Sequence, residues 1–364
     1  MPQVTKRKLI KYLPFIKTAI LVVCLIALFI YIVRLFLPIY NFSRQNNISL
    51  KFAFDFLMHG KLSLKQYQDR TNLIILGIGG GNHEGADLTD TIIFLSLDTK
   101  NHDGVILSIP RDLWIPSLED KINSAYHYGE EKKQNGGLIL VKSTVEEVIN
   151  QPVHYAAIID FSGFKKMIDV VGGIDVNVEQ VFEDDLYPIA GKEDDFCGGD
   201  PTFTCRFEKL HFDAGLQHMD GEKALKYVRS RHAEGDEGND FSRNKRQQQV
   251  IMALKDRILK TGMWKDRDMV KKLLNLFDET VVTDMDWSEK ISFAKAFMDL
   301  SDKGVKNLVL DTGDKEKNQK GFLVNPPAWE YDGAWVLVPR TGDFKEIQEY
   351  ILCNIKDTSC KMFP

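Results

Sequence analysis

The sequence lacks the motifs of several common enzyme classes. It contains no Gly-Lys-Ser/Thr end of a Walker A loop, no Gly-x-Ser-x-Gly turn and no His-Glu-x-x-His pair. A glycine cluster at residues 77–81 follows an expected strand, but Asn82 stands where a dinucleotide-binding loop has its last glycine, and a second strand is expected next. Nucleotide hydrolysis, serine esterase, zinc peptidase and Rossmann-type functions are therefore disfavoured.

A surplus of basic residues is also missing from most of the chain. The 364 residues carry a net charge of −5, and residues 1–40 hold several Lys and Arg but no acid. The remainder is therefore more acidic than the whole, which argues against nucleic-acid binding. Repeats, low-complexity segments and long linkers are absent as well. With 44% hydrophobic and 27% charged residues, the composition predicts a large globular domain.

Cysteine is scarce, with five in the chain. Cys24 lies in an apolar segment, and the others form two close pairs, Cys197 with Cys205 and Cys353 with Cys360. Neither pair has the C-x-x-C spacing of metal knuckles, and histidines nearby are few, so two local disulfides are favoured over free thiols or a zinc site. Disulfides are typical of proteins outside the cytoplasm.

One long apolar run interrupts the globular composition. Residues 18–33 are all apolar, small or aromatic, and the apolar character continues past Arg34. The run is longer than the apolar region of a typical signal peptide, and no clear Ala-x-Ala site follows, so a retained transmembrane helix over residues 15–38 is favoured over a cleaved signal. Basic residues precede it, so the positive-inside rule predicts a cytoplasmic tail (residues 1–14) and a single-pass cell-membrane protein with an extracellular C-terminal domain.

Alternating strands and helices after a juxtamembrane region (residues 39–69) predict one α/β domain over residues 70–364, a three-layer α/β/α arrangement with a central mixed sheet. Runs of β-branched residues bounded by Gly, Pro and Asp predict strands at 72–78, 91–97, 104–109, 153–159 and 174–178. Helical periodicity predicts helices at 137–149, 164–171, 221–228, 241–260, 264–277 and 287–300.

Two further segments complete this prediction. Residues 183–212 show neither the strand nor the helix periodicity. They are expected to form a surface excursion closed by the first cysteine pair. A strand at 334–338 and a helix at 344–355 are expected to return to the main sheet.

The segment 227–249 carries the strongest chemical signal. It reads YVRSR, then an acidic loop, then DFSRNKRQQQ at the start of an amphipathic helix. Asp240 or Ser242 can cap that helix, which places Arg243 and Arg246 in its first turns. Cations are unfavourable there because of the helix dipole, so a bound anion is expected to offset them.

Arg243 and Gln247 are four residues apart and share a helix face. Guanidinium and amide donors at a helix N-terminus are typical of a phosphate or pyrophosphate site, which Arg229 and Arg231 would close from the side. The alternative is a solvated basic face paired with the acidic residues of the preceding loop.

A second cluster favours the phosphate site. Arg111, in SIPRD at residues 108–112, follows the third expected strand, and α/β sheets bind ligands at strand ends. Asp90 begins the second strand after a Gly-rich turn, and a carboxylate near phosphates is a typical Mg²⁺ ligand. Asp87 and His83 share that turn, but a lone loop histidine is usually solvated, so His83 is not counted as a ligand.

Seven short motifs in order resemble the LytR-CpsA-Psr family over roughly residues 70–260. They are LTDT (88–91), SIPRD (108–112), KINSAY (121–126), DFSGF (160–164), DVVGGIDV (169–176), YVRSR (227–231) and DFSRNKRQ (240–247). The resemblance implies an extracytoplasmic phosphotransferase that moves a glycopolymer, such as a teichoic acid or capsular polysaccharide, from a polyprenyl-pyrophosphate carrier to peptidoglycan. It also implies Mg²⁺ or Mn²⁺ at the pyrophosphate.

The resemblance also implies roles for individual residues. The family's pyrophosphate-binding arginines and glutamine correspond to Arg111, Arg229, Arg231, Arg243 and Gln247. Arg246, in the first turns of the same helix as Arg243, is also expected to bind pyrophosphate.

In this scheme Arg111, Arg229 and Arg243 are catalytic and neutralise the phosphates, and Asp240 accepts the proton of the acceptor hydroxyl. The family's metal-binding aspartate corresponds to Asp90.

Two positions depart from the family pattern. Gly79 stands where the family has its first acidic metal ligand, and Leu88 where it has an arginine. Asp87 could replace the missing ligand from the same turn, or Asp90, phosphate oxygens and water could hold the metal alone. A hydrolase of lipid-linked pyrophosphate and a non-catalytic polymer-binding module remain the two alternative functions.

Overall fold

The computed structural model describes residues 21, 23–31, 33–34, 37, 40–41, 43–81, 85–189, 191–192, 194–233, 238, 240–301, 304–314, 319–356 and 360. The expected cytoplasmic tail (residues 1–14) and much of the expected span (residues 15–38) lie outside these residues. Among those that are described, no helix combines the length and the apolar character needed to cross a membrane.

The chain divides into two compact units, one of residues 1–63 with 286–293, the other of residues 64–285 with 294–364. The smaller unit contains helix α2 (Leu50–His59), which begins at Ser49, whose side chain accepts a hydrogen bond from the backbone N–H of Phe52 at 3.0 Å. Gly60 ends the helix with a φ of 63°, a conformation that favours glycine.

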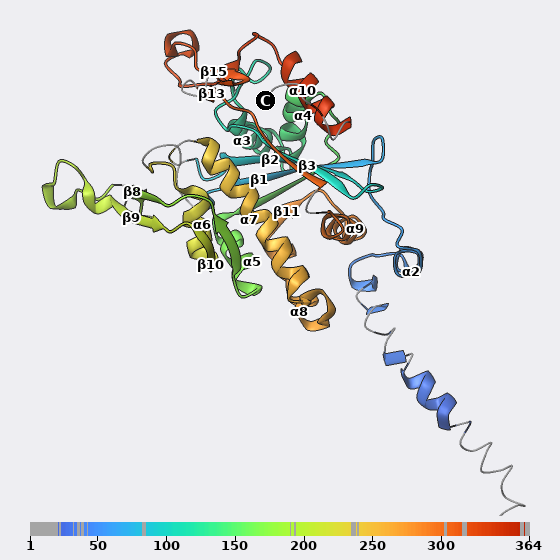
Figure 1. Ribbon diagram of the computed structural model, residues 1–364. Coiled ribbons are helices and arrows are strands. Elements are labelled where there is room, and N and C mark those ends of the chain that lie inside the picture. Colours follow the sequence, from blue (N-terminus) through green and yellow to red (C-terminus); the bar gives the residue numbers. More distant parts are fainter. Residues whose placement is uncertain are drawn as a thin grey trace, which may run out of the picture. The chain divides into compact units, whose positions relative to one another are not determined.

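A six-stranded sheet forms the centre of the larger unit (Figure 1). Its strand order is β11-β6-β1-β2-β3-β12. Its strands are β1 (Arg70–Ile78), β2 (Thr89–Asp98), β3 (Asp103–Ser108), β6 (Tyr155–Asp160), β11 (Val281–Thr283) and β12 (Val305–Val309). β1 pairs with β6 and β3 with β12 in parallel, whereas the other neighbours are antiparallel. The expected mixed sheet is therefore confirmed.

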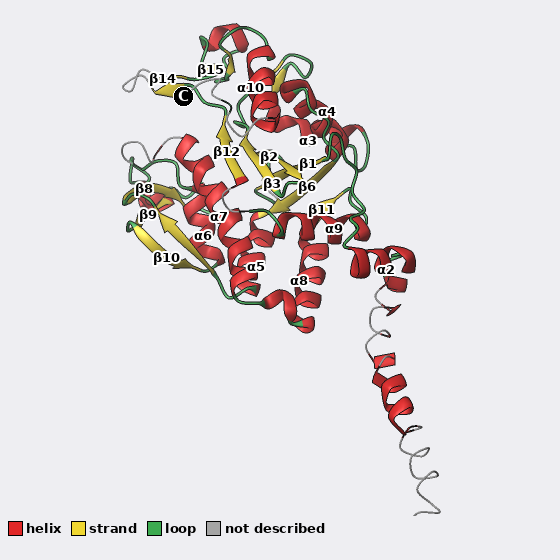
Figure 2. Cartoon of the chain, turned by 45° about the vertical axis from the view of Figure 1, so that its right-hand side comes forward, coloured by secondary structure: helices red, strands yellow, loops and turns green. Residues whose placement is uncertain are grey.

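Helices cover both faces of this sheet, as expected (Figure 2). One face packs on α3 (Ala125–Lys132), α4 (Gly137–Ile149) and α10 (Lys345–Lys356). The other faces α5 (Phe161–Val170), α6 (Gly221–Arg229) and α7 (Asp240–Lys260). Successive strand residues point to opposite faces, so Ile74 and Phe94 enter the first core while Ile75 and Ile93 face the second layer.

Beside α6 and α7 lies a second apolar core built on two strand pairs (Figure 1). The pairs are β7 (Ile174–Val178) with β10 (Gly215–Met219), and β8 (Phe182–Pro188) with β9 (Phe207–Phe212). The expectation of a patternless excursion at residues 183–212 was therefore wrong for β8 and β9. The alternation of buried and exposed residues in β8 was hidden in the sequence because one of its fully buried positions is the charged residue Asp184.

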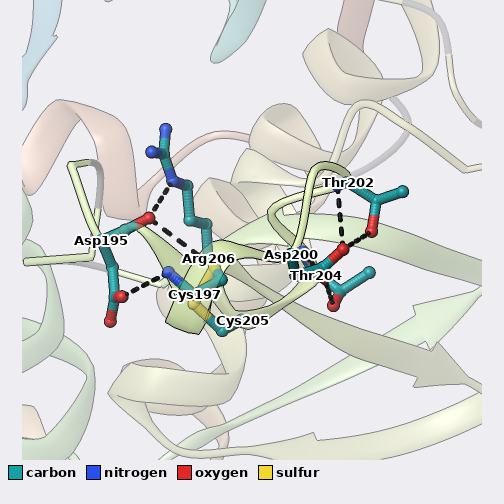
Figure 3. Close-up of a disulfide and its surroundings, with 7 residues drawn as sticks. All are labelled: Asp195, Cys197, Asp200, Thr202, Thr204, Cys205 and Arg206. Atoms are coloured by element: carbon teal, nitrogen blue, oxygen red, sulfur yellow. Dashed lines mark hydrogen bonds between the residues drawn. A yellow bond between two sulfur atoms is a disulfide. The ribbon is translucent and has the colours of Figure 1, made fainter.

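The β8–β9 hairpin ends in a disulfide between Cys197 and Cys205 (Figure 3). The Asp195 side chain accepts a hydrogen bond from the backbone of Cys197 at 2.8 Å, and its carbonyl accepts one from Arg206 Nε at 2.8 Å. A second disulfide joins Cys353 of α10 to Cys360. These are the two pairs that the spacing predicted.

The C-terminal strand is placed differently from the expectation for residues 334–338. β16 (Val338–Pro339) pairs with β15 (Leu323–Val324), and Leu337 bridges to Leu113, so this segment adds no strand to the central sheet. The sheet edges are instead β11 and β12, which are too short for a periodic signal. The expected C-terminal helix is α10, whose Ile347 and Ile351 pack into the first core.

The remaining elements of the larger unit are short or peripheral to the sheet. They are β4 (Trp114–Ile115), β5 (Asp120–Lys121), α8 (Arg267–Thr280), β13 (Gly313–Asp314) and β14 (Gln319–Lys320). Helix α9 (Trp287–Met298) contains residues of both units.

Candidate functional site

A pocket of about 190 Å³ lies between the β1–β2 face of the sheet and helices α5, α6 and α7. Much of its wall is apolar, with side chains from Ile75, Ile93, Ile159, Phe164, Leu225, Val228 and Ile251. Its charged lining residues are Asp90, Arg111, Asp160, Asp184, Arg229, Arg231 and Arg243. The arginines outnumber the carboxylates, so the pocket combines an apolar body with cationic groups.

Strand ends supply one side of this charged group. Arg111 Nη1 donates to the Asp90 carboxylate, and Arg111 Nε lies 3.4 Å from a carboxylate oxygen of Asp112. Asp112 is held in turn by Lys121 Nζ at 2.8 Å. The Asp90 side chain keeps 41% of its surface exposed, so it remains accessible to a ligand. The expected neighbours Asp90 and Arg111 therefore meet in space.

The start of α7 supplies the opposite side. Arg243 and Gln247 are nearly buried, and Gln247 Nε2 donates to Thr91 Oγ1 at 3.0 Å. A Cβ atom on Gly77 would lie 3.0 Å from Thr91 Cβ, so glycine allows β1 to pass close to this threonine. The helix start is thus fixed against the ends of β1 and β2, and both expected residues line the pocket.

Arg229, the last residue of α6, is held by aromatic rings. Its guanidinium carbon lies 4.2 Å from the ring centre of Phe161 and 5.6 Å from that of Tyr187, and Nη1 donates to the Tyr187 hydroxyl at 3.3 Å. Burial raises the pKa of Tyr187, more than the nearby guanidinium lowers it, so the hydroxyl stays neutral. These contacts orient Arg229 while leaving its charge available to an anion.

Asp184 fixes the segment that follows Arg229. Its buried carboxylate accepts hydrogen bonds from the Ser230 hydroxyl at 2.7 Å, from the backbone of Arg231 at 3.2 Å and of His232 at 3.3 Å, and from the backbone of Leu186 at 3.0 Å. Burial raises the pKa of Asp184, but these donors outweigh it and hold the pKa below its ordinary value. The sequence analysis did not identify Asp184. Its only signal in the sequence is an acidic residue at a position that the alternation of a strand would bury.

Arg246 does not line the pocket, contrary to the expectation that it binds pyrophosphate. It is 2% exposed, and it donates to the carbonyls of Tyr227 at 2.9 Å and Ser230 at 2.5 Å. Its guanidinium also lies over the Phe182 ring at 4.8 Å. Residues three apart on a helix diverge by roughly 60°. Arg243 therefore faces the pocket while Arg246 ties α7 to the second core.

Asp87 is also placed differently from its expected metal role. Its carboxylate lies 2.7 Å from Nδ1 of His127 on α3, and it is not among the pocket-lining residues. That hydrogen bond raises the pKa of His127 above its ordinary value. The side chain of Asp240 and all of His83 lie outside the described residues.

Asp160 is a pocket carboxylate that sequence reasoning did not single out. It ends β6 beside Ile78 of β1, and its Oδ1 accepts the backbone N–H of Gly163 at 2.7 Å, which caps α5. A Cβ atom on Gly80 would lie 2.9 Å from Asp160 Cβ. The carboxylate therefore lies against the Gly79–Gly80 turn. Gly79 is the position at which the family pattern has an acidic metal ligand that this chain lacks.

The comparisons with known proteins agree with this fold. A model of the LytR_cpsA_psr family matches residues 40–332, and the chain belongs to that family.

Several relatives carry a common functional name, polyisoprenyl-teichoic acid–peptidoglycan teichoic acid transferase. TagU of Bacillus cereus is 32% identical over 188 residues, which are 50% of this chain and 51% of the relative. TagV of Bacillus subtilis is 30% identical over 232 residues, 62% of this chain and 52% of the relative. The chain thus spans about half the length of these relatives.

Solved structures share the fold. The crystal structure of Bacillus subtilis TagV superposes with a TM-score of 0.54 at 25% identity, covering 79% of this chain and 97% of that one. A structure titled "TagT bound to LI-WTA" superposes with a TM-score of 0.52 at 21% identity, covering 79% and 93%.

Proposed function

We propose that the protein transfers a glycopolymer from a polyprenyl-pyrophosphate carrier to peptidoglycan and leaves a phosphodiester link. The observation that carries this proposal is the pocket in which Arg111, Arg229 and Arg243 meet above an apolar wall. An amphiphile with an anionic head and a hydrocarbon tail matches both parts. The transferase names of the relatives support the same activity.

In the bound donor, the start of the polyprenyl chain lies along the apolar wall and the pyrophosphate among the arginines. Burying hydrocarbon contributes about 25 cal/mol per Å² removed from water. Guanidinium groups bind phosphate oxygens through charge-assisted, bidentate hydrogen bonds. Arg231 and Gln247 add donors from the pocket rim.

In the reaction, an acceptor hydroxyl attacks the phosphorus that carries the glycopolymer. The bond from this phosphorus to the bridging oxygen breaks, and polyprenyl phosphate leaves with that oxygen and the electron pair. Arg111, Arg229 and Arg243 stabilise the charge that develops on the phosphate oxygens. The proton of the hydroxyl passes to Asp240, at the start of α7.

The pocket carboxylates fit a hard divalent cation. Asp90 and Asp160 both line the pocket, and carboxylate and phosphate oxygens are the ligands that Mg²⁺ prefers. We propose that Asp90, with Asp160 in place of Asp87, holds Mg²⁺ or Mn²⁺ together with the pyrophosphate. When bound, the cation neutralises charge on the phosphate oxygens.

We further propose that the protein is anchored in the cell membrane through residues 15–38, with the catalytic domain outside the cell. The apolar run, the basic residues before it and the two disulfides support this topology. The lipid carrier would then lie in the same membrane as the anchor.

The test is to incubate the full-length protein in detergent with a short-chain polyprenyl-pyrophosphate glycan and peptidoglycan oligomers, with and without Mg²⁺, and to analyse the products by mass spectrometry. A phosphodiester-linked conjugate is expected. Glycan phosphate formed at the same rate without acceptor would instead indicate a hydrolase. Donor that is bound but intact under every condition would indicate a binding module.

A further inference from the structure

We propose that an exposed aromatic turn beside the pocket binds the sugar chain of the peptidoglycan acceptor. The turn, which we call the aromatic turn, consists of residues 328–335 with Trp329, Tyr331 and Trp335, and it packs on Trp114. This inference rests on the proposed transferase function, because it assigns a place to the second substrate of that reaction.

Two tryptophans of the aromatic turn are unusually exposed. Trp329 has 78% and Trp335 has 50% of its surface accessible. Large aromatic side chains bury 150–250 Å² each in most folded environments, so exposed ones commonly mark a binding surface. Flat indole rings present apolar faces that suit the C–H faces of sugar rings.

The turn is an ordered structure. Trp329 and Tyr331 belong to a short 3₁₀ helix (Ala328–Tyr331), which is closed by hydrogen bonds from Gly333 N to Ala328 O at 2.9 Å and from Ala334 N to Tyr331 O at 2.8 Å. The aromatic rings are therefore presented from a fixed backbone, which lowers the entropic cost of binding.

The turn is attached to the segment that follows Arg111, one of the pocket-lining arginines. The Tyr331 ring contacts the Trp114 ring edge-on, with centres 4.9 Å apart. The backbone of Leu337 accepts from Trp114 N at 2.8 Å and donates to the carbonyl of Asp112 at 2.9 Å. Trp114 is three residues from Arg111, a reach of at most about 11 Å. A glycan on the aromatic turn can thus extend to the arginine cluster.

The charge of the aromatic turn favours a peptidoglycan strand as its ligand over anionic lipid or the donor polymer. Residues 325–336 contain two carboxylates, Glu330 and Asp332, and no Lys or Arg. Such a surface repels anionic lipid headgroups, and it also repels a phosphate-rich donor polymer such as a teichoic acid. The uncharged sugar rings of a peptidoglycan strand avoid this repulsion, and carboxylates accept hydrogen bonds from sugar hydroxyls.

The experiment compares the full-length protein in detergent with the Trp329→Ala/Trp335→Ala variant. The probe is a soluble, uncross-linked peptidoglycan strand without lipid or pyrophosphate, and binding is measured by titration calorimetry. We expect the double variant to bind the strand roughly tenfold more weakly or worse. Binding of a short polyprenyl pyrophosphate should be unchanged.

A matched control is Trp264→Ala, which removes a tryptophan of 53% exposure from a distant 3₁₀ helix (Met263–Lys265). It should leave binding of both ligands unchanged. In transfer assays the double variant should raise the KM for the acceptor and leave kcat and the KM for the donor as they were.

Three results would overturn the inference. They are equal strand binding by the wild-type protein and the double variant, an aromatic-dependent affinity for soluble teichoic acid instead of the strand, and an aromatic-dependent affinity for lipid vesicles with no effect on sugar. The Arg243→Ala variant separates this inference from the proposed function. It should retain strand binding while losing pyrophosphate binding, so a failed transfer assay and a failed sugar site give different results.

Discussion

The two ends of the β1–β2 pair use the same residue types for opposite purposes. At one end Gly77 pairs with Thr91 beside the pocket, and at the other Arg70 pairs with Asp98. Both ends contain arginine and aspartate. The difference lies in what surrounds each guanidinium.

At the Arg70 end the guanidinium is paired with two carboxylates. Arg70 is 7% exposed, and its guanidinium lies 3.0 Å from Asp103, 3.6 Å from Asp98 and 2.8 Å from the Ser96 hydroxyl. Burial raises the pKa of Asp98, but hydrogen bonds from residues 100 and 101, with the charge of Arg70, hold it below its ordinary value. The positive charge of Arg70 is therefore taken up by its carboxylate partners.

At the pocket end, aromatic rings and a hydroxyl position Arg229, and within the described part of the chain it forms no ion pair. Its positive charge is therefore available to an anion. Arg70 and Arg229 therefore differ in what holds the guanidinium: carboxylates hold Arg70, whereas uncharged groups hold Arg229.

The largest expected effect is on stability, from Arg70→Met. Removing the guanidinium leaves the buried Asp98 and the half-buried Asp103 without their partner, and breaking a buried pair costs about 3–5 kcal/mol. Denaturant unfolding should show this loss, and transfer activity per folded molecule should stay the same below the transition. A variant that unfolds like the wild type would remove the distinction between the two ends.

Arg243→Ala should have the next largest effect, this time on activity. Loss of one charge-stabilising donor typically lowers kcat by about 10²–10³-fold. Transfer is followed by mass spectrometry, with circular dichroism to verify the fold. Retention of full activity would exclude Arg243 from the reaction.

Asp184→Asn should weaken both stability and donor binding. The carboxylate accepts from Ser230, Arg231 and His232 at one oxygen and from the backbone of Leu186 at the other. An amide has a single acceptor oxygen, so it leaves donors on one side unsatisfied, and an unsatisfied buried group costs about 1–3 kcal/mol. The KM for the donor should rise because the segment that follows Arg229, with Arg231, loses the group that fixes it. Unfolding titrations and donor kinetics measure the two effects.

The same variant gives a pH test. The pKa of Asp184 is lowered in the folded protein, so its stabilisation is complete above the unfolded value of about 3.9 and is lost as pH falls through the lower folded value. The difference in unfolding free energy between wild type and Asp184→Asn should therefore shrink below about pH 4. A difference that stays constant down to pH 2 would contradict an ionised Asp184.

Tyr187→Phe should have the smallest effect. It removes the hydroxyl that accepts from Arg229 at 3.3 Å but keeps the ring against the guanidinium. A loss of about 0.5–1 kcal/mol, a few-fold in donor KM, follows from one long hydrogen bond. A change as large as that of Arg243→Ala would mean that the hydroxyl contacts the substrate.

Much of the fold was predictable because buried strands and amphipathic helices leave periodic patterns. β1, β2, β3, α4 and α10 were predicted close to their observed bounds. The short edge strands β11 and β12 were not, since three to five residues carry too little pattern and their place depends on pairing with distant partners.

The sequence by itself determined which residue types gather after strands and at helix starts, and it predicted that Arg111, Arg229, Arg243 and Asp90 lie together, as they do in one pocket. Only the tertiary structure placed Arg243 in the pocket and Arg246 outside it, placed Asp160 in the pocket and Asp87 beside His127, and revealed Asp184. Local spacing sets the face of an element on which a side chain lies. The partner that the side chain meets depends on how distant elements pack.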